Sequence, residues 1–269
     1  MKVEGIIVPV ITPFNANDDV DYAALAAVLE PLIAAGVHGI VACGSTGEYY
    51  TFNDEKHKKV LAFVAEKVQG RALLVAGVND TYTAGSLKKV EQAKALGYQA
   101  VMLAPPIYCL PNQQEIVQHY KTVSTVGQLP IIMYNFPARS GVEISVESVI
   151  ELSREEYIVG IKESSGDFTR ALTLLNTDFE NFEVVCGSDD QGADYLFWGA
   201  RSWIGGAANY LPEAHVQMIN AAKAGDFTTV RETMRSILPV SQNMESSDYN
   251  QKAKVGLEHR GVAAGEIRA

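Results

Sequence analysis

The sequence predicts an α/β fold, a (β/α)8 TIM barrel followed by a C-terminal helical extension. Short runs rich in β-branched residues alternate with longer amphipathic stretches, which is the pattern of βαβ units around a parallel sheet. Eight such runs occur at intervals of about 20 to 35 residues, as expected when each strand is followed by one helix. A six-strand doubly wound sheet fits this count less well.

Each predicted strand is a short apolar run bounded by polar or turn-forming residues. The eight runs are 5–12, 39–43, 72–76, 100–104, 130–134, 158–162, 182–186 and 202–205. Helical periodicity is clearest in five stretches, which are 22–35, 54–68, 83–96, 113–126 and 212–224. A glycine follows four of these stretches, at Gly36, Gly70, Gly97 and Gly225, where helix C-termini commonly place one.

The chain shows no Pro/Gly/Ser-rich linker and no low-complexity block, so we expect one barrel domain over residues 1–225. Residues 226–269 then form the helical extension, with helices expected at 229–238 and 250–259. Residues 266–269 carry no obvious stop signal. This leaves open that the extension is incomplete and that the natural chain continues beyond Ala269.

The composition is that of an ordinary globular protein, with 47% hydrophobic and 20% charged residues. A formal net charge of -10 opposes binding to nucleic acid or to an anionic membrane, and no basic run offers a local exception. There is neither a signal peptide nor a run of about 18 apolar residues. The protein is therefore expected in the cytoplasm, with small molecules as its partners.

Cysteine and histidine often mark metal or redox sites, but their spacing in this sequence does not suit such sites. Cys43, Cys109 and Cys186 are odd in number, lack CxxC spacing and lie in or beside apolar runs, which predicts reduced, buried thiols. The five histidines are scattered, and none pairs with Cys, Asp or Glu at a ligand spacing. We therefore expect no metal and look for a mechanism without one.

Polar residues follow the strands at the carboxyl ends, which is where TIM barrels carry their active sites. These residues are Thr12, Ser45, Thr46, Tyr108, Tyr134 and Lys162. The set contains one amine and several hydroxyls but no pair of carboxylates. Glycosidase chemistry is therefore disfavoured, and catalysis by an amine nucleophile is favoured.

Each of these residues also has a plainer explanation. Lys162 ends an apolar run and could extend its ammonium to solvent as a cap. Tyr134 could be a packed core residue with its hydroxyl at the rim, and Arg139 could form a surface ion pair. Residues 44–48, Gly-Ser-Thr-Gly-Glu, could be an ordinary turn, although their amides and hydroxyls also suit a carboxylate or phosphate. Their occurrence on one rim favours the functional explanation.

Three motifs, in order and spacing, resemble the dihydrodipicolinate synthase and N-acetylneuraminate lyase superfamily. They are Gly-Ser-Thr-Gly-Glu at 44–48, Tyr-Asn-Phe-Pro at 134–137 and Gly-Ile-Lys-Glu-Ser-Ser-Gly-Asp at 160–167. Residues 186–190 and 204–206 also fit the last two strands of that family. The resemblance runs from about Gly5 to about Leu257, nearly the whole chain.

The resemblance implies a metal-free and cofactor-free Schiff-base lyase that acts on pyruvate or on keto acids related to it. Lys162 would form the imine, and Tyr134 would transfer protons. Ser45 and Tyr108 would complete a proton relay, with the tyrosine supplied by a neighbouring subunit, which implies a homo-oligomer built from dimers, such as a tetramer. Thr46 would hold the pyruvate carboxylate, and the family positions that line the pyruvate pocket are Gly187 and Ile204.

The identity of the second substrate depends on fewer residues. Arg139 stands where dihydrodipicolinate synthases bind the carboxylate of aspartate semialdehyde, so the sequence favours the lysine-pathway synthase. Residues 105–111 depart from the usual synthase pattern, because only Tyr108 of two adjacent tyrosines is present. An aldolase or dehydratase for a sugar-acid keto acid, of the N-acetylneuraminate or 2-keto-3-deoxygluconate type, remains an alternative. A catalytically silent barrel that binds a keto acid is the alternative from another class.

Overall fold

The protein forms a closed barrel of eight parallel strands in chain order, as seen in a computed structural model that describes residues 1–268. The strands are β1 Gly5–Pro9, β2 Gly39–Ala42, β3 Leu73–Gly77, β4 Ala100–Leu103, β5 Ile131–Asn135, β6 Ile158–Glu163, β7 Glu183–Cys186 and β8 Ser202–Ile204. The pairing of β8 with β1 closes the barrel. The predicted (β/α)8 fold and all eight strand positions are confirmed.

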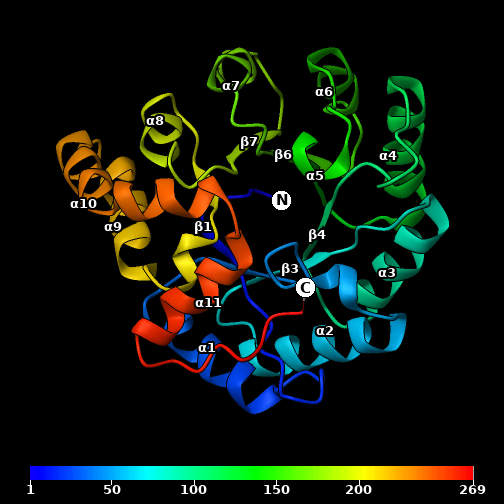
Figure 1. Cartoon of the computed structure of the whole chain (residues 1–269). Coiled ribbons are helices and arrows are strands. Elements are labelled where there is room, and N and C mark those ends of the chain that lie inside the picture. The colour runs from blue at the N-terminus through cyan, green and yellow to red at the C-terminus, as the bar shows by residue number, and fades with distance from the viewer. Residues whose placement is uncertain (269) are drawn as a thin grey trace.

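Helices surround the barrel, as Figure 1 shows. Those that follow the strands are α1 Tyr22–Ala34, α2 Asp54–Val68, α3 Thr83–Ala95, α4 Gln113–Gly127, α5 Pro137–Ser140, α6 Val146–Leu152, α7 Phe168–Leu175, α8 Gly192–Phe197 and α9 Pro212–Lys223. Two short 3-10 helices, η1 Tyr49–Thr51 and η2 Ala207–Asn209, lie after β2 and β8. The C-terminal part adds α10 Phe227–Ser246 and α11 Tyr249–His259.

The five helices predicted from periodicity are present, and the four glycines that follow them have positive φ, between 72° and 82°. The helices α5 to α8 were not predicted individually because each contains eight residues or fewer. Such short helices cover barely two turns, so their hydrophobic periodicity is weak. Packing against neighbouring elements stabilises them instead; α6 packs against α4, α7 against β7, and α8 against α9 and α10.

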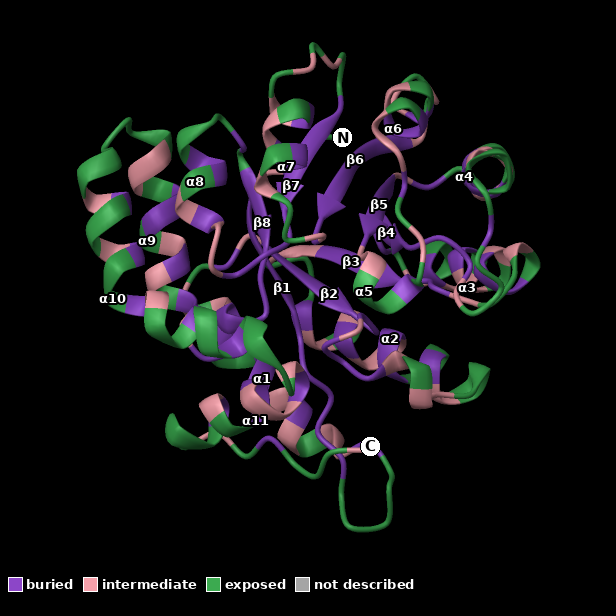
Figure 2. Cartoon of the chain, turned by 45° about the horizontal axis from the view of Figure 1, so that its top comes forward, coloured by how far each residue is buried: buried purple, intermediate pink, exposed green. Residues whose placement is uncertain are grey.

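The apolar residues form two layers, and successive strand residues alternate between them. Figure 2 shows that the barrel strands are buried, whereas the surrounding helices carry exposed residues. One cluster fills the barrel interior and includes Ile7, Val75, Ile132 and Ile204. The other lies between the strands and the surrounding helices, and Ile161 belongs to it. Because Ile161 faces outward, the next residue, Lys162, faces the barrel axis.

The C-terminal helices return to the barrel mouth. The α10 helix packs against α8 and α9, and α11 contacts η2. Lys254 of α11 forms an ion pair with Glu48, which follows β2, at 2.7 Å, and both side chains are buried. The Arg268 backbone amide donates to the same carboxylate at 2.9 Å. The extension thus holds the β2 loop in place; the domain division at residue 225 remains a prediction.

Candidate active site

Lys162 and Tyr134 lie side by side at the carboxyl ends of β6 and β5. The two residues are register partners, and the Lys162 Nζ lies 4.4 Å from the centre of the Tyr134 ring. Only 6% of Lys162 and 4% of Tyr134 is exposed. The amine is therefore held within the barrel mouth and does not extend into solvent as a surface cap.

A small cavity of about 30 Å³ opens between these two side chains. Its lining residues come from β5, β6, α5, α10, α11 and the loops that follow the strands. They are Ser45, Thr46, Tyr134, Phe136, Arg139, Lys162, Ser164, Gly187, Glu245 and Tyr249. The cavity thus combines the amine with hydroxyls, a guanidinium and one carboxylate.

A second cavity of about 310 Å³ adjoins the first and shares Ser45, Tyr134, Phe136 and Arg139 with it. Its remaining walls are Tyr49, Tyr50, Asn79, Ala104, Ile107 and Ser140. Burial raises the pKa of Tyr49 to about 12, against the opposing hydrogen bond with Asn79, so this phenol stays protonated at neutral pH. A larger hollow of about 480 Å³ lies at the other end of the barrel, remote from Lys162.

The loop after β2 is a tight turn that presents Ser45 and Thr46 to the small cavity. The Gly47 amide donates to the Gly44 carbonyl at 3.0 Å, and the Glu48 amide donates to the Ser45 carbonyl at 3.1 Å. Glu48 has φ +57°, which ends the turn in the left-handed region. Asn250 of α11 also donates to the Ser45 carbonyl at 3.1 Å, so the extension fixes this loop directly.

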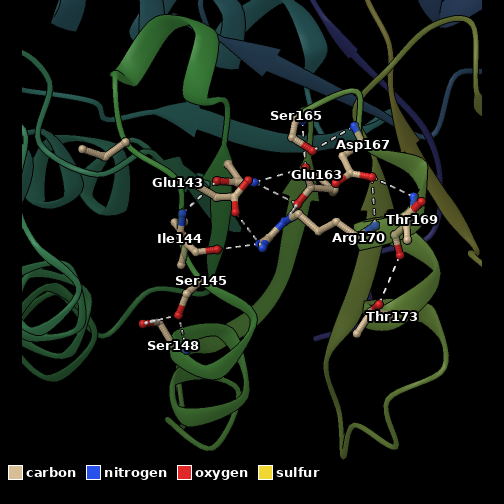
Figure 3. Close-up of polar contacts among 12 residues, drawn as sticks. Glu143, Ile144, Ser145, Ser148, Glu163, Ser165, Asp167, Thr169, Arg170 and Thr173 are labelled. Atoms are coloured by element: carbon tan, nitrogen blue, oxygen red, sulfur yellow. Dashed lines mark hydrogen bonds and ion pairs between the residues drawn. The ribbon is translucent and has the colours of Figure 1, made fainter.

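The residues that follow Tyr134 and Lys162 are joined by a buried polar network, shown in Figure 3. Arg170 Nε donates to Glu163 Oε2 at 2.8 Å, and Asn135 Nδ2 donates to both oxygens of that carboxylate. The Ile144 carbonyl accepts from Arg170, and the Ile144 amide donates to Asn135 Oδ1. A buried ion pair that satisfies its remaining polar atoms in this way fixes the ends of β5 and β6 relative to each other.

Of the residues singled out in the sequence, three lie outside the small cavity of their own chain, and one of them, Thr12, is buried after β1. Ile204 ends β8 within the barrel interior, where it belongs to the same apolar cluster as Tyr134. Tyr108 is 93% exposed and has φ +74°. The next residue, Cys109, is exposed on the same loop, so the prediction of a buried thiol is wrong there, although Cys43 and Cys186 are buried. Gly187, Thr46, Ser45 and Arg139 all line the cavity.

Four lining residues were not identified from the sequence. Phe136 and Ser164 lie inside recognised motifs and could have been found there. Glu245 and Tyr249 belong to the helical extension, far along the chain from Lys162, and no local pattern marks them. Tyr249 donates its hydroxyl to Asp189, whose carboxylate also accepts from the Gly206 amide at 3.1 Å.

No group of three or more His, Cys, Asp or Glu side chains arranged to bind a metal is present in residues 1–268. Over the same residues, no helix has both the length and the apolar character needed to cross a membrane. The cationic groups at the cavity are the side chains of Lys162 and Arg139. The side chains that line the cavity include an amine, which can act as a nucleophile, and phenol and carboxylate groups, which can transfer protons.

Comparison with known proteins agrees with this geometry. A 4-hydroxy-tetrahydrodipicolinate synthase from an Exiguobacterium species is 33% identical over 264 residues, which cover 98% of this chain and 90% of the relative. One from Methanosarcina barkeri is 34% identical over 98% of this chain and 91% of the relative.

The solved structures give the same result. Dihydrodipicolinate synthase from Aquifex aeolicus superimposes with a TM-score of 0.94 at 32% identity, covering 98% of this chain and 90% of that one. The Acinetobacter baumannii enzyme, solved with pyruvate, gives a TM-score of 0.96 at 30% identity over 99% and 92%. The family model described as the dihydrodipicolinate synthetase family matches residues 2–269. The resemblance drawn from three motifs is confirmed, and the chain belongs to the dihydrodipicolinate synthetase family.

Proposed function

We propose that this protein is a 4-hydroxy-tetrahydrodipicolinate synthase that condenses pyruvate with aspartate semialdehyde through a Schiff base on Lys162. The observation that carries the proposal is the placement of the Lys162 amine beside Tyr134 in a cavity that Thr46 also lines. The names of the relatives and the pyruvate-bound neighbour support it. The family's class I aldolase mechanism requires an amine at this point.

The first half of the reaction uses the small cavity. Lys162 Nζ attacks the keto carbon of pyruvate, and the resulting carbinolamine loses water to give an iminium ion. Tyr134 supplies and removes the protons on oxygen, because its side chain packs against the Lys162 amine. The hydroxyl and backbone of Thr46 hold the pyruvate carboxylate in the turn that follows β2.

The second half uses the adjoining cavity. Loss of a methyl proton turns the iminium ion into an enamine, whose carbon attacks the aldehyde carbon of the second substrate. Arg139 lines both cavities and offers a planar fork of donors for a carboxylate. We therefore assign Arg139 to the carboxylate of aspartate semialdehyde, with Gly187 and Ile204 shaping the pyruvate end.

The proton relay requires a second chain. Ser45 lines both cavities, whereas Tyr108 is almost wholly exposed at the tip of the loop after β4. An exposed tyrosine with no role in its own cavity is available to enter that of a partner. We propose a homo-oligomer in which Tyr108 of one subunit completes the relay of the next, located in the cytoplasm.

Reductive trapping tests the Schiff base. Borohydride added with pyruvate should give the wild-type protein one stable mass adduct, and Lys162→Ala should give none. A wild-type protein that traps no keto acid would leave the silent barrel as the better explanation. The same reaction followed with a panel of aldehydes identifies the product and hence the second substrate.

One observation favours a second candidate. Ile107, in the loop that departs from the usual synthase pattern, lines the adjoining cavity together with Tyr49 and Tyr50. This wall could suit a sugar-derived keto acid or aldehyde, as in a lyase of the N-acetylneuraminate or 2-keto-3-deoxygluconate type. Faster turnover with uncharged sugar-derived aldehydes than with aspartate semialdehyde would select it.

A further inference from the structure

Glu245 brings a carboxylate to the Lys162 cavity from outside the barrel. It lies in the last turn of α10, and its side chain is largely exposed along its length. Its carboxylate end nevertheless faces the barrel mouth, where Oε1 accepts a hydrogen bond from the Asp189 amide at 2.6 Å. Glu245 and Lys162 line the same cavity of about 30 Å³.

Glu245 and Tyr134 approach the amine from different neighbours of β6. Lys162 is paired with Tyr134 of β5 on one side and with Val185 of β7 on the other. The Glu245 carboxylate is anchored to Asp189, which lies in the loop after β7. The cavity therefore has a phenol on the β5 side and a carboxylate on the β7 side.

The proposed Schiff-base reaction needs two kinds of proton transfer. Protons must move on and off oxygen while the carbinolamine forms and loses water, and a proton must leave the methyl carbon before the enamine can form. Tyr134 was assigned to the first kind. A base that approaches the bound keto acid from a different side than Tyr134 can carry out the second kind without a change in the position of that phenol.

We propose that Glu245 is the catalytic base that removes the methyl proton from the pyruvate iminium ion. The C–H bond breaks, its electron pair forms the new carbon–carbon double bond, and the iminium nitrogen becomes the neutral nitrogen of the enamine. The proton passes to the Glu245 carboxylate and can return to carbon in the reverse step. This inference rests on the Schiff-base function proposed above.

The surroundings of Glu245 suit this role. Burial of the carboxyl group, together with the charges of Asp189 and Asp190, raises the pKa of Glu245 to about 7, against the Asp189 amide and the Lys162 charge, which lower it. Tyr249, which also lines the cavity, donates its hydroxyl to Asp189. A base with a pKa close to the working pH can both accept and return a proton.

Exchange of the pyruvate methyl protons in heavy water, followed by proton NMR, tests the proposal without any second substrate. The variants are Glu245→Gln, Glu245→Asp and, as a matched control, Glu232→Gln, which changes an exposed glutamate on the same helix. The glutamine keeps a side-chain oxygen that can accept the hydrogen bond from the Asp189 amide. Borohydride trapping with pyruvate is measured on every variant.

The expected result is that Glu245→Gln still traps pyruvate but exchanges methyl protons on the order of 10² to 10⁴ times more slowly than the wild type. Glu245→Asp should recover part of the rate, and Glu232→Gln should match the wild type. The wild-type exchange rate should rise with pH through an apparent pKa near 7, and this step should be absent in Glu245→Gln.

Two results would overturn the proposal. One is methyl exchange in Glu245→Gln within about twofold of the wild type, far from the loss expected of a missing base. The other is failure of a folded Glu245→Gln to trap pyruvate, which would place Glu245 before imine formation. Failure of the wild type to trap pyruvate is a separate result and would remove the Schiff-base function itself.

Discussion

Lys162 and Tyr134 are direct register partners on neighbouring strands, and the amine nitrogen lies 4.4 Å from the centre of the tyrosine ring. Parallel pairing sets this distance through the backbone, so it does not depend on the flexible lysine side chain alone. The Asn135 and Glu163 side chains that follow are hydrogen-bonded to each other, which holds the pairing in register. The amine and the phenol to which we assign nucleophilic attack and proton transfer are therefore positioned before substrate binds.

Replacing Tyr134 by Phe keeps the ring against Lys162 and removes only the hydroxyl. We expect kcat for the condensation to fall on the order of 10² to 10⁴-fold, because proton transfer on oxygen is lost. Borohydride should still label Lys162, at a slower rate. Steady-state kinetics together with a trapping time course measures both effects, and an unchanged kcat would remove Tyr134 from the mechanism.

Replacing Arg139 by Ala separates the two substrates. The KM for aspartate semialdehyde should rise while the KM for pyruvate stays near the wild-type value, because Thr46 is assigned to the pyruvate carboxylate. A lost charged hydrogen bond of about 1.5 to 3 kcal/mol corresponds to a fall of about 10 to 150-fold in kcat/KM for the aldehyde. Arg154→Ala, at an exposed arginine remote from the site, is the control.

Replacing Arg170 by Met leaves Glu163 as a buried carboxylate without its ion-pair partner. We expect the free energy of unfolding in urea to fall by about 3 to 5 kcal/mol. Changing Glu163 to Leu in the same chain should recover part of this loss, since no charge then remains unpaired. Lys121→Met, which breaks a solvent-exposed pair with Glu151, should cost no more than about 1 kcal/mol.

Buried His57 should make the protein less stable in mild acid. Burial lowers the pKa of His57 to about 4, although a hydrogen bond to the Gly77 carbonyl opposes the shift. Between about pH 6.5 and pH 4 the unfolded chain therefore binds more protons at this site, and stability falls as pH falls through this range.

Comparison of the wild type with His57→Gln isolates this contribution. The free energy of unfolding of the wild type should drop about 2 kcal/mol more than that of the variant between pH 7 and pH 5. His259→Gln, at an exposed position, should follow the wild type. Equal pH dependence in the wild type and His57→Gln would contradict the prediction.

The parts of the site that the sequence predicts are those governed by local pattern. A buried apolar run places Lys162 at a strand end, and the same reasoning places Tyr134 and Thr46 on the same rim. Glu245 could not be found in this way, because its position depends on how α10 packs over the β7 loop after a long intervening stretch of chain. The role of Tyr108 stays a prediction, because the function proposed for it depends on a second chain.

The ion pair between Glu48 and Lys254 also bears on how the protein is made. The β2 loop emerges early during synthesis, yet the side chains that hold it, Asn250 and Lys254, come from α11. Until those residues leave the ribosome, the Glu48 carboxylate lacks its counter-charge and cannot be buried at low cost. A barrel that is still being translated should therefore lack an ordered β2 loop. The chemistry proposed for Lys162 should then begin only after α11 has been synthesised.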